Sequence, residues 1–72
     1  MEKELKYNKA IFFMDLKWKV HILLENGFVH NGIIENVEAD FLLLEDERKG
    51  LIPIFFIEII DIEKYILGEK KE

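Results

Sequence analysis

The stretch from Val20 to Asp46, VHILLENGFVHNGIIENVEADFLLLED, constrains the fold more than any other part of the chain. It reads as three consecutive β-strands, and the first two of them meet at Asn26-Gly27. Asn-Gly is favoured in a two-residue type I′ turn, because both central residues of that turn need a positive φ. A turn at a fixed place sets the pairing register of the strands on either side. The sequence therefore predicts a β-hairpin at the centre of the molecule.

The chain has 72 residues, which is the size of one small domain. Such a domain buries only about 60 % of the surface of its unfolded chain, so it usually needs disulfides, a metal or a partner subunit. There is no cysteine, which excludes disulfides and thiolate metal sites, and two histidines alone make a poor structural zinc site. Self-association is the stabilising device that remains, and we expect no cofactor and no metal.

The composition, 50% hydrophobic and 35% charged, is that of an ordered protein. No apolar run approaches the length of about 20 residues that spans a bilayer, and the N-terminal MEKELKYNK lacks the apolar core of a signal peptide. We therefore expect a soluble cytoplasmic protein without membrane contact. The net charge of −5 argues against coating nucleic acid through bulk electrostatics, but it leaves room for a local basic patch.

Apolar periodicity divides the chain into an N-terminal extension at 1–15, a β-domain at 16–63 and a charged tail at 64–72. A helix near residues 3–13 is predicted by apolar residues at helical spacing, Tyr7, Ile11, Met14 and Trp18. The alternation from Phe12 to Leu24 is also compatible with one long strand, although that length is unusual in a small domain. The strands are expected at 16–25, 28–37, 40–46, 51–57 and 57–62.

Two residues inside the predicted strands restrict their geometry. Gly32 in the second strand marks a sharp bend or a close backbone approach, and Pro53 in the fourth strand is typical of a sheet edge. The predicted fold is therefore mainly β: a small, strongly bent five-stranded antiparallel barrel with a short N-terminal α-helix.

The third and fourth strands are apolar on both faces. Only one face of a strand can point into the core of a small barrel, so the other face is left for water or for a partner. An edge strand with an apolar face also invites pairing with another strand. We therefore predict that copies of the chain associate; the alternative is that the N-terminal helix covers this surface. The candidate interface residues are Leu51, Ile52, Ile54, Phe55, Phe56, Ile57, Ile59 and Ile60. Depending on the register, either the Ile52, Ile54 and Phe56 face or the Phe55 and Ile57 face would be exposed.

The run V-x-I-x-L-x-N-G from Val20 to Gly27, followed by Gly32 and the apolar LLLED, resembles the first conserved segment of the Sm/LSm superfamily. It is most similar to the Hfq-like branch, and the resemblance covers residues 16–63, with Phe55–Ile62 in place of the second Sm segment. The resemblance implies a helix on a strongly bent five-stranded barrel. It also implies that the fourth and fifth strands pair between neighbours in a ring of six or seven subunits that binds uridine- or adenine-rich single-stranded RNA.

The chain departs from the Hfq-like pattern at the uridine pocket. The family's Tyr-Lys-His falls on Phe55, Phe56 and Ile57, and its stacking aromatic falls on Asp40, with Phe41 beside it. The Asp-x-x-Met-Asn of other Sm proteins is also absent. The purine-binding positions on the opposite face are better preserved. They match Leu23, Gly27, Phe28 and His30.

The predicted hairpin register gives a second argument for that face. It places Leu23 opposite His30, with His21 diagonal to His30 on the same face. Cations beside an exposed aromatic are the usual means of holding single-stranded nucleic acid, and this face collects Lys17, Lys19, His21, Phe28 and His30. The alternatives are a solvated face whose lysines protect a sheet edge and, more weakly, a metal bound by the two histidines.

The chain contains no catalytic constellation, and the carboxylates Glu45, Asp46 and Glu47 are typical of a solvated turn. We therefore expect a non-enzymatic, Sm-like ring protein without a small-molecule substrate that binds single-stranded RNA. The alternative is an Sm-fold structural or protein-interaction module that has lost RNA binding. The candidate RNA-binding residues are Lys17, Lys19, His21, Leu23, Gly27, Phe28, His30, Asp40 and Phe41.

Overall fold

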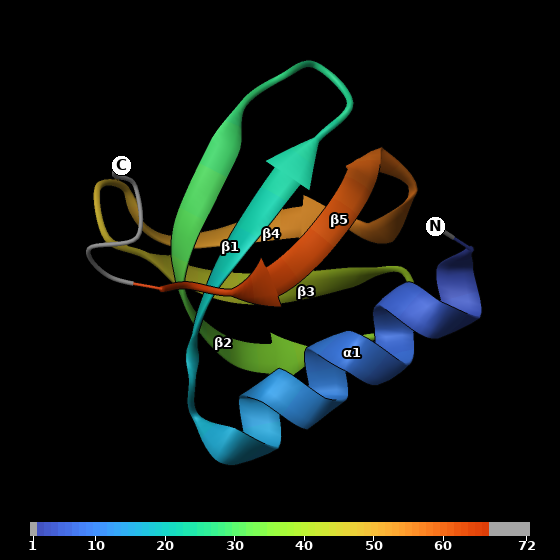
Figure 1. The fold of residues 1–72 in the computed structure, drawn as a ribbon, viewed down its shortest axis with the longest axis horizontal. Coiled ribbons are helices and arrows are strands. Elements are labelled where there is room, and N and C mark those ends of the chain that lie inside the picture. The colour runs from blue at the N-terminus through green and yellow to red at the C-terminus, as the bar shows by residue number, and fades with distance from the viewer. Residues whose placement is uncertain (1, 67–72) are drawn as a thin grey trace.

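The structure, a computed structural model, describes residues 2–66 as one helix followed by a bent antiparallel sheet (Figure 1). The elements are α1 (Lys3–Leu16), β1 (Lys19–Leu24), β2 (Val29–Val37), β3 (Phe41–Asp46), β4 (Gly50–Phe55), the 3-10 turn η1 (Phe56–Glu58) and β5 (Ile59–Lys64). The strand order is β4-β3-β2-β1-β5. The predicted mainly β fold with a strongly bent five-stranded sheet and an N-terminal helix is confirmed, although the sheet stays open between β4 and β5. The tail predicted at 64–72 lies outside the described residues from position 67 onward.

Helix α1 is longer than predicted and ends at Leu16; it is capped by Lys17, which adopts the left-handed conformation with φ 57°. Its N–H donates to the Met14 carbonyl over 3.1 Å, and the Trp18 N–H donates to the Phe13 carbonyl over 3.2 Å, so the last turn is closed by the backbone itself. The alternative of a strand beginning at Phe12 is therefore wrong. The core-facing residues Ala10 and Phe13 attach the helix to the sheet.

The β1–β2 turn differs from the predicted type I′ turn. The Gly27 N–H donates to the Leu24 carbonyl and the Leu24 N–H donates to the Phe28 carbonyl, both over 2.9 Å, so the loop contains three residues. Within this loop only Gly27 has a positive φ, at 90°, and the Asn26 side chain accepts a hydrogen bond from the Phe28 N–H. A type I turn followed by a left-handed glycine is the usual three-residue hairpin.

The longer turn shifts the hairpin register by one residue. His30 lies opposite Ile22 rather than Leu23, and His21 lies opposite Asn31. A one-residue shift moves every side chain of a strand to the other face of the sheet. The prediction that His21 and His30 share a face is therefore wrong, and with it the shared metal site.

Gly32 lies where the backbone of β2 passes close to that of β3. A Cβ on Gly32 would be 2.1 Å from the carbonyl oxygen of Glu45 and 3.0 Å from the Cα of Asp46. The predicted close backbone approach is confirmed. Register shifts between Ile34 and Asn36 and between Leu23 and Leu24 accompany the bend of the sheet.

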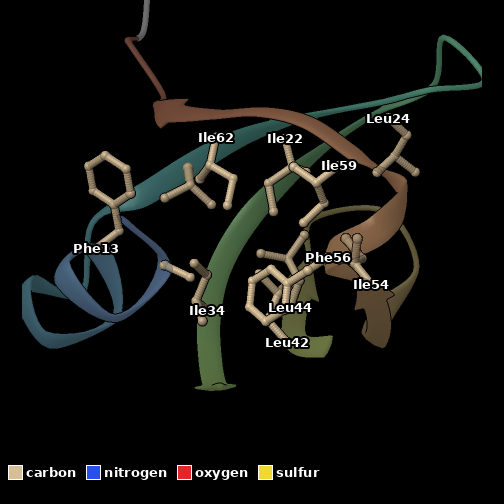
Figure 2. Close-up of a cluster of buried hydrophobic side chains, with 12 residues drawn as sticks. Phe13, Ile22, Leu24, Ile34, Leu42, Leu44, Ile54, Phe56, Ile59 and Ile62 are labelled. Atoms are coloured by element: carbon tan, nitrogen blue, oxygen red, sulfur yellow. The ribbon is translucent and has the colours of Figure 1, made fainter. Parts of the chain in front are cut away.

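The bent sheet encloses a hydrophobic core (Figure 2). Figure 2 shows side chains of β1 and β5 meeting those of β3 and β4, with Phe13 of α1 closing one end. The buried residues are Ala10, Phe13, Val20, Ile22, Leu24, Ile34, Leu42, Leu44, Ile54, Phe56, Ile59 and Ile62. Among residues 2–66, no helix is both long and apolar enough to cross a membrane.

The core decides which face of the fourth strand is exposed. Ile54, Phe56 and Ile59 are buried within the protomer and Ile52 packs against the core, so these four cannot present their side chains to a second copy as predicted. The exposed members of the predicted interface are Leu51, Phe55, Ile57 and Ile60. Helix α1 packs against β2, β5 and η1 and leaves these side chains in solvent. The alternative in which the helix covers them is therefore wrong.

Candidate nucleic-acid interface

The outer face of the β1–β2 hairpin carries only part of the predicted basic patch. Lys19 and His21 lie on it, whereas Lys17 belongs to the end of α1. The His21 Nδ1 lies 2.8 Å from the Asn31 side-chain oxygen. Phe28 and His30 face the other side because of the shifted register.

The Lys19 side chain is bound by other residues of the same chain. Its ammonium forms an ion pair with Glu47 and lies 4.3 Å from the centre of the Tyr65 ring. The hydrogen bond between the two raises the pKa of the Lys19 ammonium and lowers that of the Glu47 carboxyl. A paired lysine stabilises the sheet surface locally and has less charge to offer a phosphate.

A first open pocket, of about 430 Å³, lies between the start of β2 and the β3–β4 turn. We call it the hairpin-side pocket; its lining residues are Gly27, Phe28, Val29, His30, Asp46, Arg48 and Lys49. It gathers three of the predicted residues, Gly27, Phe28 and His30, but Leu23 does not line it. Phe28 exposes 64% of its surface there.

Asp46 is a structural centre of the hairpin-side pocket. Its sequence context had instead indicated a solvated turn residue. Its Oδ2 accepts hydrogen bonds from the N–H groups of Arg48 and Lys49, each over 2.9 Å, and its Oδ1 lies 3.1 Å from the Nδ1 of His30. Burial acts to raise the pKa of Asp46, but these hydrogen bonds outweigh it and hold the pKa below its usual value. The carboxylate therefore fixes both the turn and the orientation of the imidazole.

A second open pocket, of about 590 Å³, lies where α1 meets the end of β4. We call it the helix-side pocket; its lining residues are Lys3, Lys6, Asp40, Phe55, Phe56 and Ile57. Lys6 is only 8% exposed, and its Nζ donates to the Phe56 carbonyl over 2.8 Å. Lys3 forms an ion pair of 3.0 Å with Asp40. In Figure 1 the N-terminal end of α1 lies across the molecule from the β3–β4 turn.

The two edges of the sheet are β4 and β5, and neither is paired on its outer side by any of residues 2–66. Pro53 lies in β4, so its prediction as an edge residue is confirmed. Exposed apolar side chains flank both edges, with Leu51 and Phe55 on β4 and Ile60 on β5. Ile57, in the connecting η1, exposes 80% of its surface.

These features can be compared with solved structures. The chain superimposes on the crystal structure of Hfq, described as a pleiotropic translational regulator, with a TM-score of 0.72 over 82% of this chain and 97% of that one. The chain has the Hfq-like Sm fold. The two sequences are 20% identical, so the likeness concerns the fold. No protein-family model matches the sequence, and a search of curated proteins finds no match.

In this Hfq-like fold, the residues at the uridine-pocket positions have other structural roles. Phe55 and Ile57 form apolar walls of the helix-side pocket, and Phe56 turns into the core. Positive charge is supplied instead by Lys3 and Lys6 of α1. Asp40 also lines the pocket, whereas Phe41 packs its ring against Phe55 at 5.4 Å between centroids.

Sequence reasoning missed four charged residues of the two pockets: Lys3, Lys6, Arg48 and Lys49. One signal was available for Lys6, which falls on the helical stripe of the buried residues Ala10 and Phe13, at spacings of four and seven. A polar residue on a buried stripe indicates a satisfied or functional group. For Arg48 and Lys49, the signal was the preceding Asp46, because aspartate at the start of a turn bonds the backbone that follows it.

Proposed function

We propose that this chain is a cytoplasmic, ring-forming Sm-like protein without catalysis of its own that binds single-stranded RNA. The observation that carries the proposal is the pair of open sheet edges, β4 and β5, with exposed apolar side chains beside them. An unpaired edge presents a row of free N–H and C=O groups, and natural proteins cover or pair such edges. A second copy pairs its β5 with β4 of the first and covers Leu51, Phe55, Ile57 and Ile60.

The small size of the protomer supports the same assembly. The described core is a single layer of side chains inside one bent sheet, and the chain has no cysteine with which to staple it. Pairing of the β4 and β5 edges between copies extends the ladder of backbone hydrogen bonds and also buries apolar surface. Six or seven subunits then close the ring, as the Sm resemblance implies.

The helix-side pocket supports the proposed RNA binding. It combines apolar walls from Phe55 and Ile57 with the ammonium groups of Lys3, which is paired with Asp40, and Lys6, which donates to the Phe56 carbonyl. An ammonium has three donors, so one such contact leaves two for a ligand. An aromatic or apolar wall accepts a base, and a lysine ammonium donates to a base carbonyl or a phosphate. Because Ile57 stands beside the open β4 edge, each neighbouring subunit in a ring completes one wall of such a pocket.

Native mass spectrometry of the purified protein, with and without short oligo(U) and oligo(A), tests both parts of the proposal. We expect a six- or seven-subunit species that takes up oligonucleotide. Lys3→Gln and Lys6→Met are expected to weaken binding, whereas Lys9→Met, which removes a charge from the same helix outside the pocket, serves as the control. A single-protomer mass at micromolar concentration would refute ring formation. A ring that takes up neither oligonucleotide would refute RNA binding.

A second candidate function is a protein-interaction module on the same fold. Leu5, Phe12 and Leu16 are exposed and lie on one stripe of α1, at spacings of seven and four residues. An exposed apolar stripe of this kind, in a chain with a net charge of −5, favours a protein partner over a nucleic acid. Tight, salt-sensitive RNA binding by the wild-type protein would exclude this candidate as the main function.

A further inference from the structure

We propose that the outer stripe of α1 docks a basic amphipathic helix of a partner protein. The stripe consists of Leu5, Phe12 and Leu16, each of which is about half exposed. Steps of seven and four residues keep the three side chains within about 40° of one another around the helix. Figure 1 shows α1 on the outside of the bent sheet. The proposal rests on the second candidate function, protein interaction, and gives the chemistry of the partner.

Phe12 is held in place although 55% of its surface is exposed. Its ring packs against the buried Phe13 at 5.6 Å and edge-on against Trp18 at 5.9 Å between centroids. A side chain that is fixed before binding loses little conformational entropy when a partner covers it, and such aromatics are typical anchors of interfaces. A leucine lies on each side of Phe12 along the helix, so the stripe offers an apolar contact about 16 Å long.

One border of the stripe is acidic. Glu4 and Asp15 directly precede the two leucines of the stripe in the sequence. The two carboxylates therefore lie on the same side of the stripe, about 16 Å apart along the helix axis. Neither of them forms an ion pair with any other of residues 2–66. Both are thus available to a cation of a partner.

The opposite border is also negative on balance. Lys9 lies there, and its Nζ is 3.6 Å from Asp61 and 2.7 Å from Glu63 of β5. One ammonium between two carboxylates leaves a net negative charge. Carboxylates outnumber ammonium groups around the whole stripe: the carboxylates are those of Glu2, Glu4, Asp15, Asp61 and Glu63, and the ammonium groups are those of Lys9, Lys17 and Lys64.

These charges select among the occupants that suit an apolar stripe. An RNA strand or an anionic membrane brings phosphates, which the carboxylates repel. A second copy in a two-fold antiparallel pair brings its own Glu4 and Asp15 to the same border, so carboxylates face carboxylates. An amphipathic helix with two Lys or Arg residues about eleven positions apart meets both carboxylates in either chain direction while its apolar side covers the stripe.

Peptide binding tests the proposal on the full chain. The probe is a labelled amphipathic peptide of about 18 residues, with leucines on one face and two lysines about eleven positions apart; a matched peptide carries glutamates in place of the lysines. In fluorescence anisotropy titrations the wild type is expected to bind only the lysine peptide, more weakly as salt rises. Phe12→Ala is expected to weaken binding roughly 5- to 30-fold.

A charge swap tests the acidic border. Glu4→Lys/Asp15→Lys is expected to reverse the preference, so that this variant binds the glutamate peptide. The control Glu25→Lys/Glu45→Lys changes the net charge equally, at exposed positions outside α1, and is expected to keep the wild-type preference. Circular dichroism verifies that each variant is folded. Leu5→Lys leaves the aromatic cluster untouched and is expected to weaken binding even if Phe12→Ala does not fold.

The outcomes separate this inference from the functions on which it rests. Equal binding of both peptides, lost in Leu5→Lys, would overturn the basic partner and keep the stripe as a protein-binding surface. No binding of either peptide would overturn the stripe as a docking site and leave ring formation and RNA binding intact. A lower subunit number for Phe12→Ala in native mass spectrometry would mean that a second copy covers the stripe, which would also overturn the proposal.

Discussion

Replacing Gly32 by alanine tests the claim that β2 lies too close to the backbone of β3 for a side chain at this position. The added Cβ would lie 2.1 Å from the Glu45 carbonyl oxygen, whereas such carbon–oxygen contacts normally have separations of about 3.3 Å, so β2 and β3 must part by about 1.2 Å. The obstacle is backbone, which cannot rotate away as a side chain does. A shift of this size breaks the ladder hydrogen bonds around the Gly32–Asp46 pair.

The magnitude follows from the contacts that are lost. Losing about two backbone hydrogen bonds costs about 1–3 kcal/mol, and overpacking costs about 1–3 kcal/mol more, so Gly32→Ala is expected to cost about 2–6 kcal/mol. A domain of this length has a total free energy of unfolding of about 4–11 kcal/mol. The variant is therefore expected to melt at least about 8 °C below the wild type.

Thermal unfolding followed by circular dichroism, at one fixed protomer concentration, measures this difference. Gly27→Ala and Gly50→Ala are matched controls, because a Cβ at either position meets nothing within 4 Å and only the positive φ opposes alanine. Each control is expected to lose about 1–2 kcal/mol. Should Gly32→Ala melt within about 4 °C of the wild type, the claim that the Glu45 carbonyl leaves no room for a Cβ at this position would be wrong.

Three further variants test other parts of the structure. Lys6→Met removes the hydrogen bond to the Phe56 carbonyl and is expected to lower the free energy of unfolding by about 1–3 kcal/mol in urea titrations; an unchanged midpoint would mean that the bond contributes nothing. Hydrogen bonds hold the pKa of Asp46 low, so the ionised carboxylate stabilises the folded state. This stabilisation is present above the usual aspartate pKa of about 4 and is lost as the pH falls through the lower pKa of Asp46 in the folded protein. Asp46→Asn should therefore be less stable than the wild type at neutral pH, and the gap between their melting temperatures should narrow in acid; a constant gap would contradict this. Ile57→Lys is expected to weaken subunit association by about 1.5–3 kcal/mol per interface in sedimentation experiments while the protomer stays folded, and Leu5→Lys, on the exposed side of α1, is the control.

The positions of the strands and the uncovered apolar surface could be predicted from the sequence, because both depend on the pattern of apolar and polar side chains. Alternation located the strands, and apolar residues on both faces of 51–57 indicated a surface that the protomer leaves uncovered. Ile54 and Phe56 were included among the candidate interface residues because the pattern alone does not say which of two apolar faces is inside. The structure resolves this through register: Ile54 lies opposite the buried Leu42.

The pockets could not be predicted in the same way. Asn-Gly favours a two-residue turn, but the loop has three residues, and within it the Asn26 side chain accepts a hydrogen bond from the Phe28 N–H. The extra residue changes the face of every β2 side chain. The β2 sequence does not distinguish the two registers, because Ile33 and Ile34 place an apolar side chain in the core in either one. Lys6 and Phe56 meet across 50 positions of sequence, and such a contact depends on how the helix packs rather than on any local signal.

The open sheet has one further consequence for how many subunits can join. The two edges belong to different strands, so in the proposed assembly β4 of one molecule pairs with β5 of the next, and a row of subunits keeps an unpaired β4 at one end and an unpaired β5 at the other. Only the angle between successive molecules decides whether the row returns to its start or continues as a filament. In the proposed assembly, the number of subunits is then a geometric property of the protomer. A substitution that alters the curvature of the sheet is expected to change that number even when every residue at the subunit interface stays the same.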